Sequence, residues 1–517
     1  MKQHPQIVNF INFIRAYMTE EVPEGDNLLA VREQIRLAEE YHLKTTFLVL
    51  YDVFDSPEYL ELLKALDPAR YEIGIWYEID QPLCEAAGIP WRGEEPWDKH
   101  CDVGYPMGYT KEERKRLADE NFRRFREVFG YSPAVFGSWF SDSYTIRYIC
   151  DTYGLDAMCS CKEQYGTDGY TLWGGYWGQA YYPSRTNVFM PAQTAARQLK
   201  TPMFKMLGSD PVYQYDFGLN TDEPDVHSQY VITLEPVYPV AGGGLPKWVD
   251  WYLRENFNGE CLSFGYAQAG QENSFGWQRM GKGLCDQIPK IAKLRDEGKL
   301  TVETLGESGR RYRAEYGTTP MSAVTAHSAY DDPAKKSVWF GSGYYRVNLY
   351  AEAGRVWIRD LHVFDETLED PFENAVCVIN DATYDTLPVA DGFVHSGNGV
   401  RSGLYLDFGA EESAGDCDFT FTELEDGCEA AFRAAHSPVF TMREKQLTVR
   451  ADADFTLRHP IGRTKEFIPE VTGMTERELC LRYRGHGYRV TLEKGRFVSP
   501  EEIRSEDGEI RASFSVP

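Results

Sequence analysis

The sequence predicts an α/β protein: an incomplete (β/α)7-type barrel followed by a C-terminal β-sandwich. Over residues 1–317, short apolar strands alternate with amphipathic helices, which is typical of a parallel sheet with helices outside it. Over residues 318–517, short strands separated by turn residues replace this alternation. About seven strands in the first part favour a barrel over a doubly wound sheet, and 517 residues suit about two to four domains.

Local signals mark the helices of the first part. Asp26 can cap a helix that runs to Tyr41, Thr110 and Glu113 form a capping box, and Gly130 stands where that second helix should end. Further helices are expected at 57–66, 143–153, 248–257 and 278–297. Strands are expected at 7–13, 45–50, 73–77, 134–140, 157–161, 203–207, 230–234, 261–266 and 300–305.

The second part reads as a sandwich whose role is structural, with a sugar-binding accessory role as the alternative. Its expected strands are short and lie between turn residues. They include 337–340, 344–350, 356–364, 404–408, 419–421, 447–451 and 488–492.

The charge of the chain argues against two classes of partner. There are 54 Lys and Arg against 80 Asp and Glu, a net charge of −26. Such a surface repels nucleic acid and anionic lipid, so neither is expected as a partner. Neutral or cationic substrates suit it better, and sugars are the commonest neutral class. An oligosaccharide or glycoside is therefore the expected partner.

A cytoplasmic location without a cofactor is expected. The apolar run at the N-terminus contains Asn9 and Asn12, reaches Arg15 and lacks a cleavage site, so it does not resemble a signal peptide. No apolar stretch is long enough to span a membrane. The 11 cysteines are scattered, which favours reduced thiols, and no His or Cys spacing predicts a metal site.

Polar residues after the predicted strands are the candidate site. In a parallel barrel, the carboxyl ends of the strands meet at one mouth. A single acidic residue there is often only a helix cap, but several converging near tryptophans indicate a site. The residues at these positions are Arg15, Asp52, Glu78, Asp80, Asp142, Lys162, Glu163, Asp210, Glu235, Glu272 and Glu307.

These residue types suit glycosidic bond cleavage, which needs two carboxyl groups. Aromatic faces can hold the apolar surface of a sugar ring, although such rings are often core. Two long loops rich in glycine and aromatic residues, 166–193 and 267–277, add polar residues. The aromatic candidates are Trp76, Trp139, Trp173, Tyr176 and Trp177, and the polar loop candidates are Asp168, Arg185, Gln193, Gln271, Glu272 and Asn273.

The first 315 residues resemble the glycoside hydrolase/deacetylase superfamily, which includes NodB-like polysaccharide deacetylases and the family-57 amylases and branching enzymes. The strand–helix order and the run Glu72–Gly74 are similar to the deacetylase third strand. The deacetylase His-xxx-His pair would fall on Trp76 and Asp80, and the paired Asp after the first strand is absent. The resemblance therefore implies the barrel but not a deacetylase metal site.

The family-57 pattern is similar at two short motifs. Gly74 to Glu78 resembles its Gly-x-x-Glu motif with one extra residue, and Trp139 to Asp142 resembles its Trp-x-x-Glu nucleophile motif with Asp in place of Glu. The family's acid follows the seventh strand, which points to Glu235 or, if the strand count shifts by one, to Glu272.

The sequence is therefore interpreted as that of a glycoside hydrolase. Asp142 is predicted as nucleophile or base, and Glu235 or Glu272 as acid. Two alternatives remain: a non-catalytic carbohydrate-binding protein on a degenerate barrel, and a divergent metal-dependent deacetylase. The predicted substrate-binding residues are Arg15, Asp52, Trp76, Glu78, Trp139, Asp168, Trp173, Trp177, Arg185 and Gln271.

Overall fold

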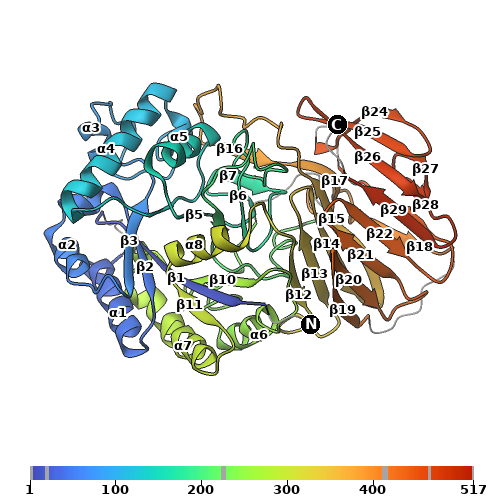
Figure 1. The fold of residues 1–517 in the computed structure, drawn as a ribbon, viewed down its shortest axis with the longest axis horizontal. Coiled ribbons are helices and arrows are strands. Elements are labelled where there is room, and N and C mark those ends of the chain that lie inside the picture. The colour runs from blue at the N-terminus through green and yellow to red at the C-terminus, as the bar shows by residue number, and fades with distance from the viewer. Residues whose placement is uncertain (1–3, 18–21, 223–228, 410–416, 464–466, 515–517) are drawn as a thin grey trace.

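A computed structural model describes residues 4–17, 22–222, 229–409, 417–463 and 467–514. The first part of the chain forms a curled, mostly parallel sheet flanked by helices, and the rest forms antiparallel sheets (Figure 1). The predicted fold class is therefore confirmed. The last barrel helix ends at Glu315 and the next strand begins at Ser322, on either side of the predicted boundary after residue 317.

The barrel sheet has the order β10-β1-β2-β3-β4-β5-β9-β8, with β11 paired to the first half of β1. Neighbours are parallel except β8 and β9, which are antiparallel. Within the described residues, β8 and β10 at the two ends share no ladder, so the barrel is incomplete. The strands are β1 (Gln6–Ile14), β2 (Thr45–Val49), β3 (Tyr71–Trp76), β4 (Val135–Gly137), β5 (Ala157–Ser160), β8 (Ala180–Tyr181), β9 (Met203–Lys205), β10 (Gly265–Ala269) and β11 (Thr301–Glu303).

The strand prediction for 230–234 is wrong. This segment makes one isolated β-bridge, at Thr233, rather than a ladder. The side chain of Gln214 accepts a hydrogen bond from Ile232 N at 2.6 Å, so a glutamine replaces the backbone partner that a strand would need. The segment still delivers Glu235 to the mouth of the barrel, because Leu234 N donates to the backbone just after β9.

Helices cover the outside of the barrel (Figure 1). The capping box of Thr110 and Glu113 forms, and Gly130 ends that helix with φ at 80°. Asp26 does not cap its own helix; its Oδ2 instead accepts from Gln278 N at the start of a neighbouring helix, which lies beside it. The helices are α1 (Asp26–Glu40), α2 (Pro57–Lys64), α3 (Gln81–Ala86), α4 (Lys111–Phe129), α5 (Ser143–Tyr153), α6 (Pro246–Asn256), α7 (Trp277–Asp296) and α8 (Leu305–Glu315).

Two antiparallel sheets form the β-sandwich. The first runs β12-β13-β14-β15-β18-β23-β28-β27, with β17 beside β15, and the second runs β19-β20-β21-β22-β29-β26-β25-β24. One apolar core contains residues from both sheets. The strands of the first sheet are β12 (Ser322–Ala326), β13 (Lys336–Gly341), β14 (Tyr345–Glu352), β15 (Arg355–Val363), β17 (Leu387–Asp391), β18 (Leu404–Asp407), β23 (Thr456–Arg458), β27 (Arg496–Ser499) and β28 (Glu502–Arg504). Those of the second are β19 (Phe419–Leu424), β20 (Gly427–Phe432), β21 (Val439–Arg443), β22 (Gln446–Arg450), β24 (Glu470–Met474), β25 (Glu478–Tyr483), β26 (His486–Lys494) and β29 (Glu509–Ser513).

A third small sheet joins the two halves of the molecule. The predicted loop 166–193 contains the second half of β6 (Gln164–Thr167) and all of β7 (Tyr170–Trp173), which pair with each other. β16 (Ala382–Asp385), from the second half, pairs in parallel with β7. The sandwich is therefore hydrogen-bonded to the segment that follows β5 at the barrel mouth.

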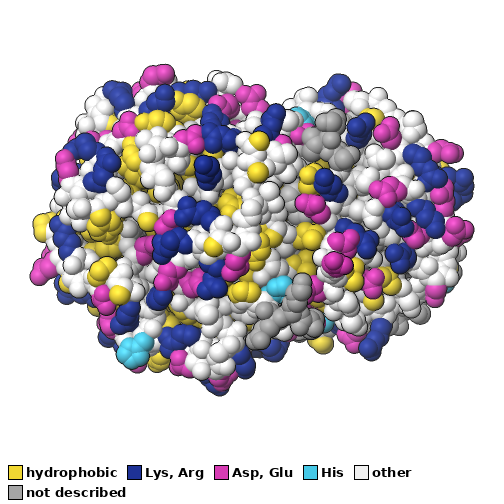
Figure 2. All heavy atoms as spheres, viewed as in Figure 1, with side chains coloured by type: hydrophobic (Ala, Val, Ile, Leu, Met, Phe, Trp, Pro, Cys, Tyr) yellow, Lys and Arg dark blue, Asp and Glu magenta, His cyan; other side chains and the backbone are white. Residues whose placement is uncertain are grey.

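The surface carries both signs of charge despite the net negative total. On the face drawn in Figure 2, acidic and basic side chains are interspersed rather than gathered by sign. Among the described helices, none has the length and apolar character to cross a bilayer.

Buried charges also cross the boundary between barrel and sandwich. Arg346 of β14 forms a two-pronged ion pair with Asp360, with both N–O distances at 2.8 Å. Its Nη1 reaches Glu163 of the barrel at 3.2 Å, and Glu163 also contacts Lys205 at 3.2 Å. Since Arg346 Nη1 donates to Gly175 O as well, a sandwich side chain holds the barrel segment 163–175 in place.

His362 also belongs to this buried network. Thr386 donates its one hydroxyl proton to Gly174 O, so it must accept from His362 Nδ1. His362 Nε2 lies 3.0 Å from Asp391, so the ring bridges Thr386 and Asp391. Burial would raise the pKa of Asp391, but the hydrogen bond and charge of His362 outweigh it and hold that pKa well below its usual range. Arg346, Lys205 and His362 therefore lie against Asp360, Glu163 and Asp391 in one buried network.

Replacing Arg346 with Met should destabilise the fold strongly. The change leaves Asp360 buried without its arginine and Glu163 with Lys205 alone, and breaking a buried ion pair from one side costs about 3–5 kcal/mol. Urea unfolding of the full chain measures the loss. Arg482→Met, which removes an exposed pair with Glu470, is the control and should change little. Equal effects of the two changes would contradict the importance of the buried network.

Candidate active site

A cavity of about 540 Å³ opens at the carboxyl ends of the barrel strands. Its volume lies within the range of ligand sites, and its position is where parallel barrels place active sites. Arg15 directly follows β1, Trp139 follows β4, and Glu272 follows β10. Aromatic rings form much of the wall: Trp97, Tyr105, Trp139, Tyr170, Tyr238 and Phe275.

Arg15 organises the acidic side of the cavity. Its Nε and Nη2 donate to the two oxygens of Glu78 at 3.0 and 2.7 Å, and its Nη1 donates to Glu272 Oε2 at 2.5 Å. Trp97 packs over the guanidinium at 4.3 Å and donates to Glu78 at 2.7 Å. Burial disfavours the charged guanidinium, but Glu272 and Glu78 outweigh that cost and raise the pKa of Arg15. Arg15 is thus a fixed cation between two carboxylates.

Glu235 lines the same cavity but has no arginine or lysine ion pair among the described residues. Thr233 Oγ1 lies 2.7 Å from its Oε2, and Gln271 Nε2 donates to its Oε1 at 3.1 Å. Burial raises the pKa of Glu235 above its ordinary value. The hydrogen bonds from Thr233 and Gln271 and the charge of Lys162 oppose this shift, whereas Glu272 adds to it. A buried carboxyl group of this kind can remain protonated where an ordinary glutamate would not.

The structure brings together five of the predicted site residues. They line one cavity because each leaves the barrel at its mouth. They are Arg15, Trp139, Asp168, Glu235 and Glu272. Glu78 and Gln271 do not line the cavity; both are fully buried directly behind it, in contact with Arg15 or Glu235.

Asp52 lies further from the cavity, in a pair with Asp80. Asp52 N donates to Asp80 at 3.0 Å, while Asp52 accepts from the backbone of Ala16 and Tyr17. Burial raises the pKa of Asp52 to about 6, with Glu78 adding to the shift. Asp52 therefore supports the backbone that follows Arg15 and does not line the cavity.

Asp142 also lies away from the cavity. It caps α5 by accepting from Thr145 N at 2.9 Å, and it pairs with the buried Arg114 at 2.9 Å. Arg114 is held by four backbone carbonyls, so this corner is a closed structural unit. This placement supports a helix-capping role for Asp142, which is a common role for an acidic residue between a strand and a helix.

The other predicted aromatic residues are core side chains. Trp76 is fully buried between Phe13 and Trp139, with ring centroids 4.1 and 5.2 Å apart. Trp177 stacks on Trp339 of the sandwich at 3.8 Å, and Trp173 donates to Asp391. Arg185 lies outside the cavity and pairs with Asp151. The sandwich therefore covers the part of loop 166–193 that was predicted to bind sugar.

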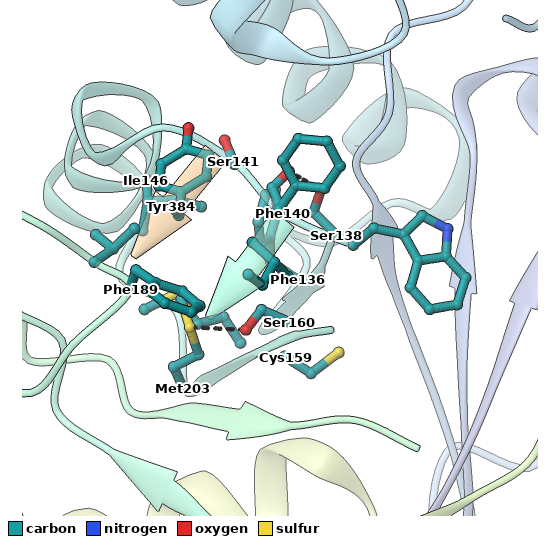
Figure 3. Close-up of a pocket in the computed structure, with 14 residues that line it drawn as sticks. Phe136, Ser138, Phe140, Ser141, Ile146, Cys159, Ser160, Phe189, Met203 and Tyr384 are labelled. Atoms are coloured by element: carbon teal, nitrogen blue, oxygen red, sulfur yellow. Dashed lines mark hydrogen bonds between the residues drawn. The ribbon is translucent and has the colours of Figure 1, made fainter. Parts of the chain in front are cut away.

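A second, much smaller cavity lies behind Trp139. Figure 3 shows its lining of Phe136, Phe140, Phe189 and Met203. Its volume of about 20 Å³ is close to that of one water molecule rather than a ligand. The polar contacts drawn there include a weak one from Ser160 Oγ to the sulfur of Met203 at 3.1 Å and one from Ser138 Oγ to Phe140 O at 2.9 Å. This space is a packing defect of the barrel wall.

Several wall residues were missed by the sequence analysis. Trp97, Lys99 and Tyr105 come from the long segment between α3 and α4, and Tyr238 and Arg279 flank the two glutamates. The segment has more than 12–15 residues without a long regular element, and that length alone signals function. Periodicity could not find it, because its residues do not repeat.

The deacetylase metal ligands do not fit here. Trp76 is an apolar side chain at a position where that family has histidine, and Asp80 caps α3 by accepting from Leu83 N. In the described part of the chain, one group is compact enough for a metal: Asp360, His362 and Asp391. Arg346 donates to both oxygens of Asp360, and the ring nitrogens of His362 lie against Thr386 and Asp391, so a cation there would have to displace these hydrogen bonds.

Comparison with known proteins supports the fold. No protein-family model and no curated protein sequence matches the chain. A candidate glycoside hydrolase/deacetylase from Parabacteroides distasonis is similar in structure, with a TM-score of 0.54 and 13% identity over 74% of this chain and 91% of that one. The chain thus has the barrel fold that the resemblance implied.

Two further solved structures match more loosely. A polysaccharide deacetylase from Pseudomonas aeruginosa PAO1 has a TM-score of 0.37 and 13% identity over 61% of this chain and 93% of that one. The 4-alpha-glucanotransferase from Thermococcus litoralis has a TM-score of 0.32 and 9% identity over 99% and 98%. These scores are too low to support a conclusion about either activity.

Proposed function

We propose that the protein is a carbohydrate-active enzyme, a glycoside hydrolase in which Glu235 and Glu272 are the reacting pair. The supporting observation is that these two carboxyl groups line one aromatic cavity in different electrostatic settings. Glu272 Oε2 accepts a hydrogen bond from the charged guanidinium of Arg15, which suits a nucleophile or base. Glu235, with its raised pKa, suits the general acid.

The proposed mechanism follows from these two settings. Glu235 protonates the glycosidic oxygen as the bond to the leaving group breaks, and Glu272 attacks the anomeric carbon or activates a water molecule. Arg15 and Glu78 hold Glu272 in place, since Arg15 bridges both. Trp97, Trp139 and Tyr238 offer apolar faces to the sugar.

The cytoplasmic location and the absence of a required metal are part of this proposal. Eight of the 11 cysteines are buried and they are scattered through the fold, as suits a reducing compartment. A non-catalytic binding protein would show no turnover, whereas a metal-dependent deacetylase would lose its activity on chelation.

Hydrolysis that survives chelation is the expected result. Purified full-length protein is incubated with a panel of aryl glycosides and oligosaccharides, with and without EDTA. We expect release of reducing sugar or aryl alcohol in both conditions and its loss in Glu272→Gln. Acetate release from N-acetylated oligosaccharides, abolished by EDTA and restored by Zn²⁺, would instead support the deacetylase. Saturable binding without turnover would support the binding protein.

A further inference from the structure

Gln271 is locked between the two proposed reacting residues. It follows Gly270, whose φ of 110° and close approach to Ile11 O exclude any side chain there: an added Cβ would lie 2.1 Å from that oxygen. Gln271 N donates to Asn12 Oδ1 at 3.2 Å, and Gln271 O accepts from Gln34 Nε2 at 3.0 Å. With no exposed surface, the residue has one available position.

The orientation of the Gln271 amide is determined by its neighbours. Glu272 N lies 2.8 Å from one terminal atom, and a backbone N–H can only donate, so that atom is Oε1. The other terminal atom is therefore the NH2 group, which donates to Glu235 Oε1 at 3.1 Å. A flipped amide would place a donor against a donor at Glu272 and an acceptor against an acceptor at an ionised Glu235.

This orientation distinguishes the two oxygens of Glu235. In a protonated carboxyl group the carbonyl oxygen is the better acceptor, and Gln271 requires an acceptor at Oε1. At Oε2 the partner is the hydroxyl of Thr233 at 2.7 Å, which, unlike an amide NH2 group, can turn to accept, so Oε2 is the oxygen that can carry the proton. We infer that Gln271 is a positioning residue that assigns the transferable proton of Glu235 to Oε2 and so aims the acid. This inference rests on the proposed roles of Glu235 and Glu272.

Other groups facing Glu235 do not take over this task. Lys162 donates to Glu163 O and Gln164 Oε1 rather than to Glu235. In addition to burial, the charge of Glu272 raises the pKa of Glu235, and the charge of Glu235 in turn raises the pKa of Cys161 and of Tyr238. None of these three groups orients the carboxyl group through a hydrogen bond. Gln271 and Thr233 are the side chains with hydrogen bonds to its carboxyl group in the described structure.

Two substitutions of Gln271 test the inference through rate and pH profile. Gln271→Met removes the donor and should lower kcat about 10- to 100-fold with KM within about threefold, because the acid is misaimed rather than lost. Gln271→Glu keeps the shape and the acceptor for Glu272 N. Its second carboxylate should move the alkaline limb of kcat upward by about one pH unit or more, because like charges favour the protonated acid.

Gln268→Met is the matched control. Gln268 is buried in the same strand, β10, and lies outside the cavity, so its loss should leave kcat and the pH profile unchanged. Melting temperatures confirm that each variant is folded. If both Gln271 variants behave like the control, or raise only KM, the inference is overturned, and a KM effect alone would return Gln271 to substrate binding. Full activity in Glu235→Gln would instead refute the proposed function itself.

Discussion

Glu235→Gln should reduce kcat/KM by about 10²- to 10⁴-fold on oligosaccharides, the contribution expected of a general acid. The amide cannot give a proton to the leaving oxygen, although it retains the size of the side chain. On an aryl glycoside whose leaving group is a weak base, the loss should be much smaller, because that group departs without protonation. Steady-state kinetics on the two substrate types measures the difference.

The pH profile provides an independent readout of the same change. Because the pKa of Glu235 is raised by burial, the acid should stay protonated to higher pH than an ordinary glutamate, and activity should fall as pH rises through that pKa. The alkaline limb should therefore vanish in Glu235→Gln.

Asp142→Asn is the control for this experiment. Asparagine can still cap α5, but it removes the counter-charge of the buried Arg114, so we expect lower stability with kcat unchanged in the folded protein. Loss of activity in Asp142→Asn with full activity in Glu235→Gln would reverse the assignment and restore Asp142 as the reacting residue.

Arg15→Met should impair both stability and rate. The change leaves Glu78 fully buried without a counter-charge and frees Glu272, at a cost of about 3–5 kcal/mol in the free energy of unfolding. Chemical denaturation measures this loss. Arg36→Met on α1, where both ion pairs are on the surface, is the control and should have little effect.

Arg15→Lys separates the catalytic from the stabilising role of Arg15. Lysine keeps the charge but cannot donate to Glu78 through two prongs and to Glu272 at once. We expect a folded protein whose kcat is lowered by about 10- to 100-fold, because Glu272 loses its orientation. Wild-type kcat in this variant would show that Arg15 serves stability alone.

Much of the candidate site could be predicted from strand ends. Arg15, Trp139, Glu235 and Glu272 were singled out because they follow predicted strands, and the shared direction of parallel strands brings them to one mouth. The rule worked for Glu235 even though 230–234 is not a strand. Glu235 reaches the cavity because segment 230–234 runs toward the barrel mouth, whether or not that segment forms a strand ladder.

The same rule could not distinguish Asp142 from Glu235. Both follow a segment that enters the barrel mouth, and both are buried. The carboxyl group of Asp142 is paired with Arg114, 28 positions earlier in the chain, and does not line the cavity. Glu235 does line the cavity. Trp173 and Trp177 likewise appeared to belong to a binding loop, and residues of the sandwich, Asp391 and Trp339, make them core.

The sequence by itself determined the fold class, the alternation of strands and helices, the capping box of α4 and the end of the barrel near which acidic residues gather. These features depend on residue periodicity and on contacts between close neighbours in the chain, which sequence records directly. Only the tertiary structure decided which carboxyl groups face a cavity, which are held by Arg15 or Arg114, and how Gln271 is oriented. Those properties depend on burial and on charges from residues far away in sequence, and no local pattern contains them.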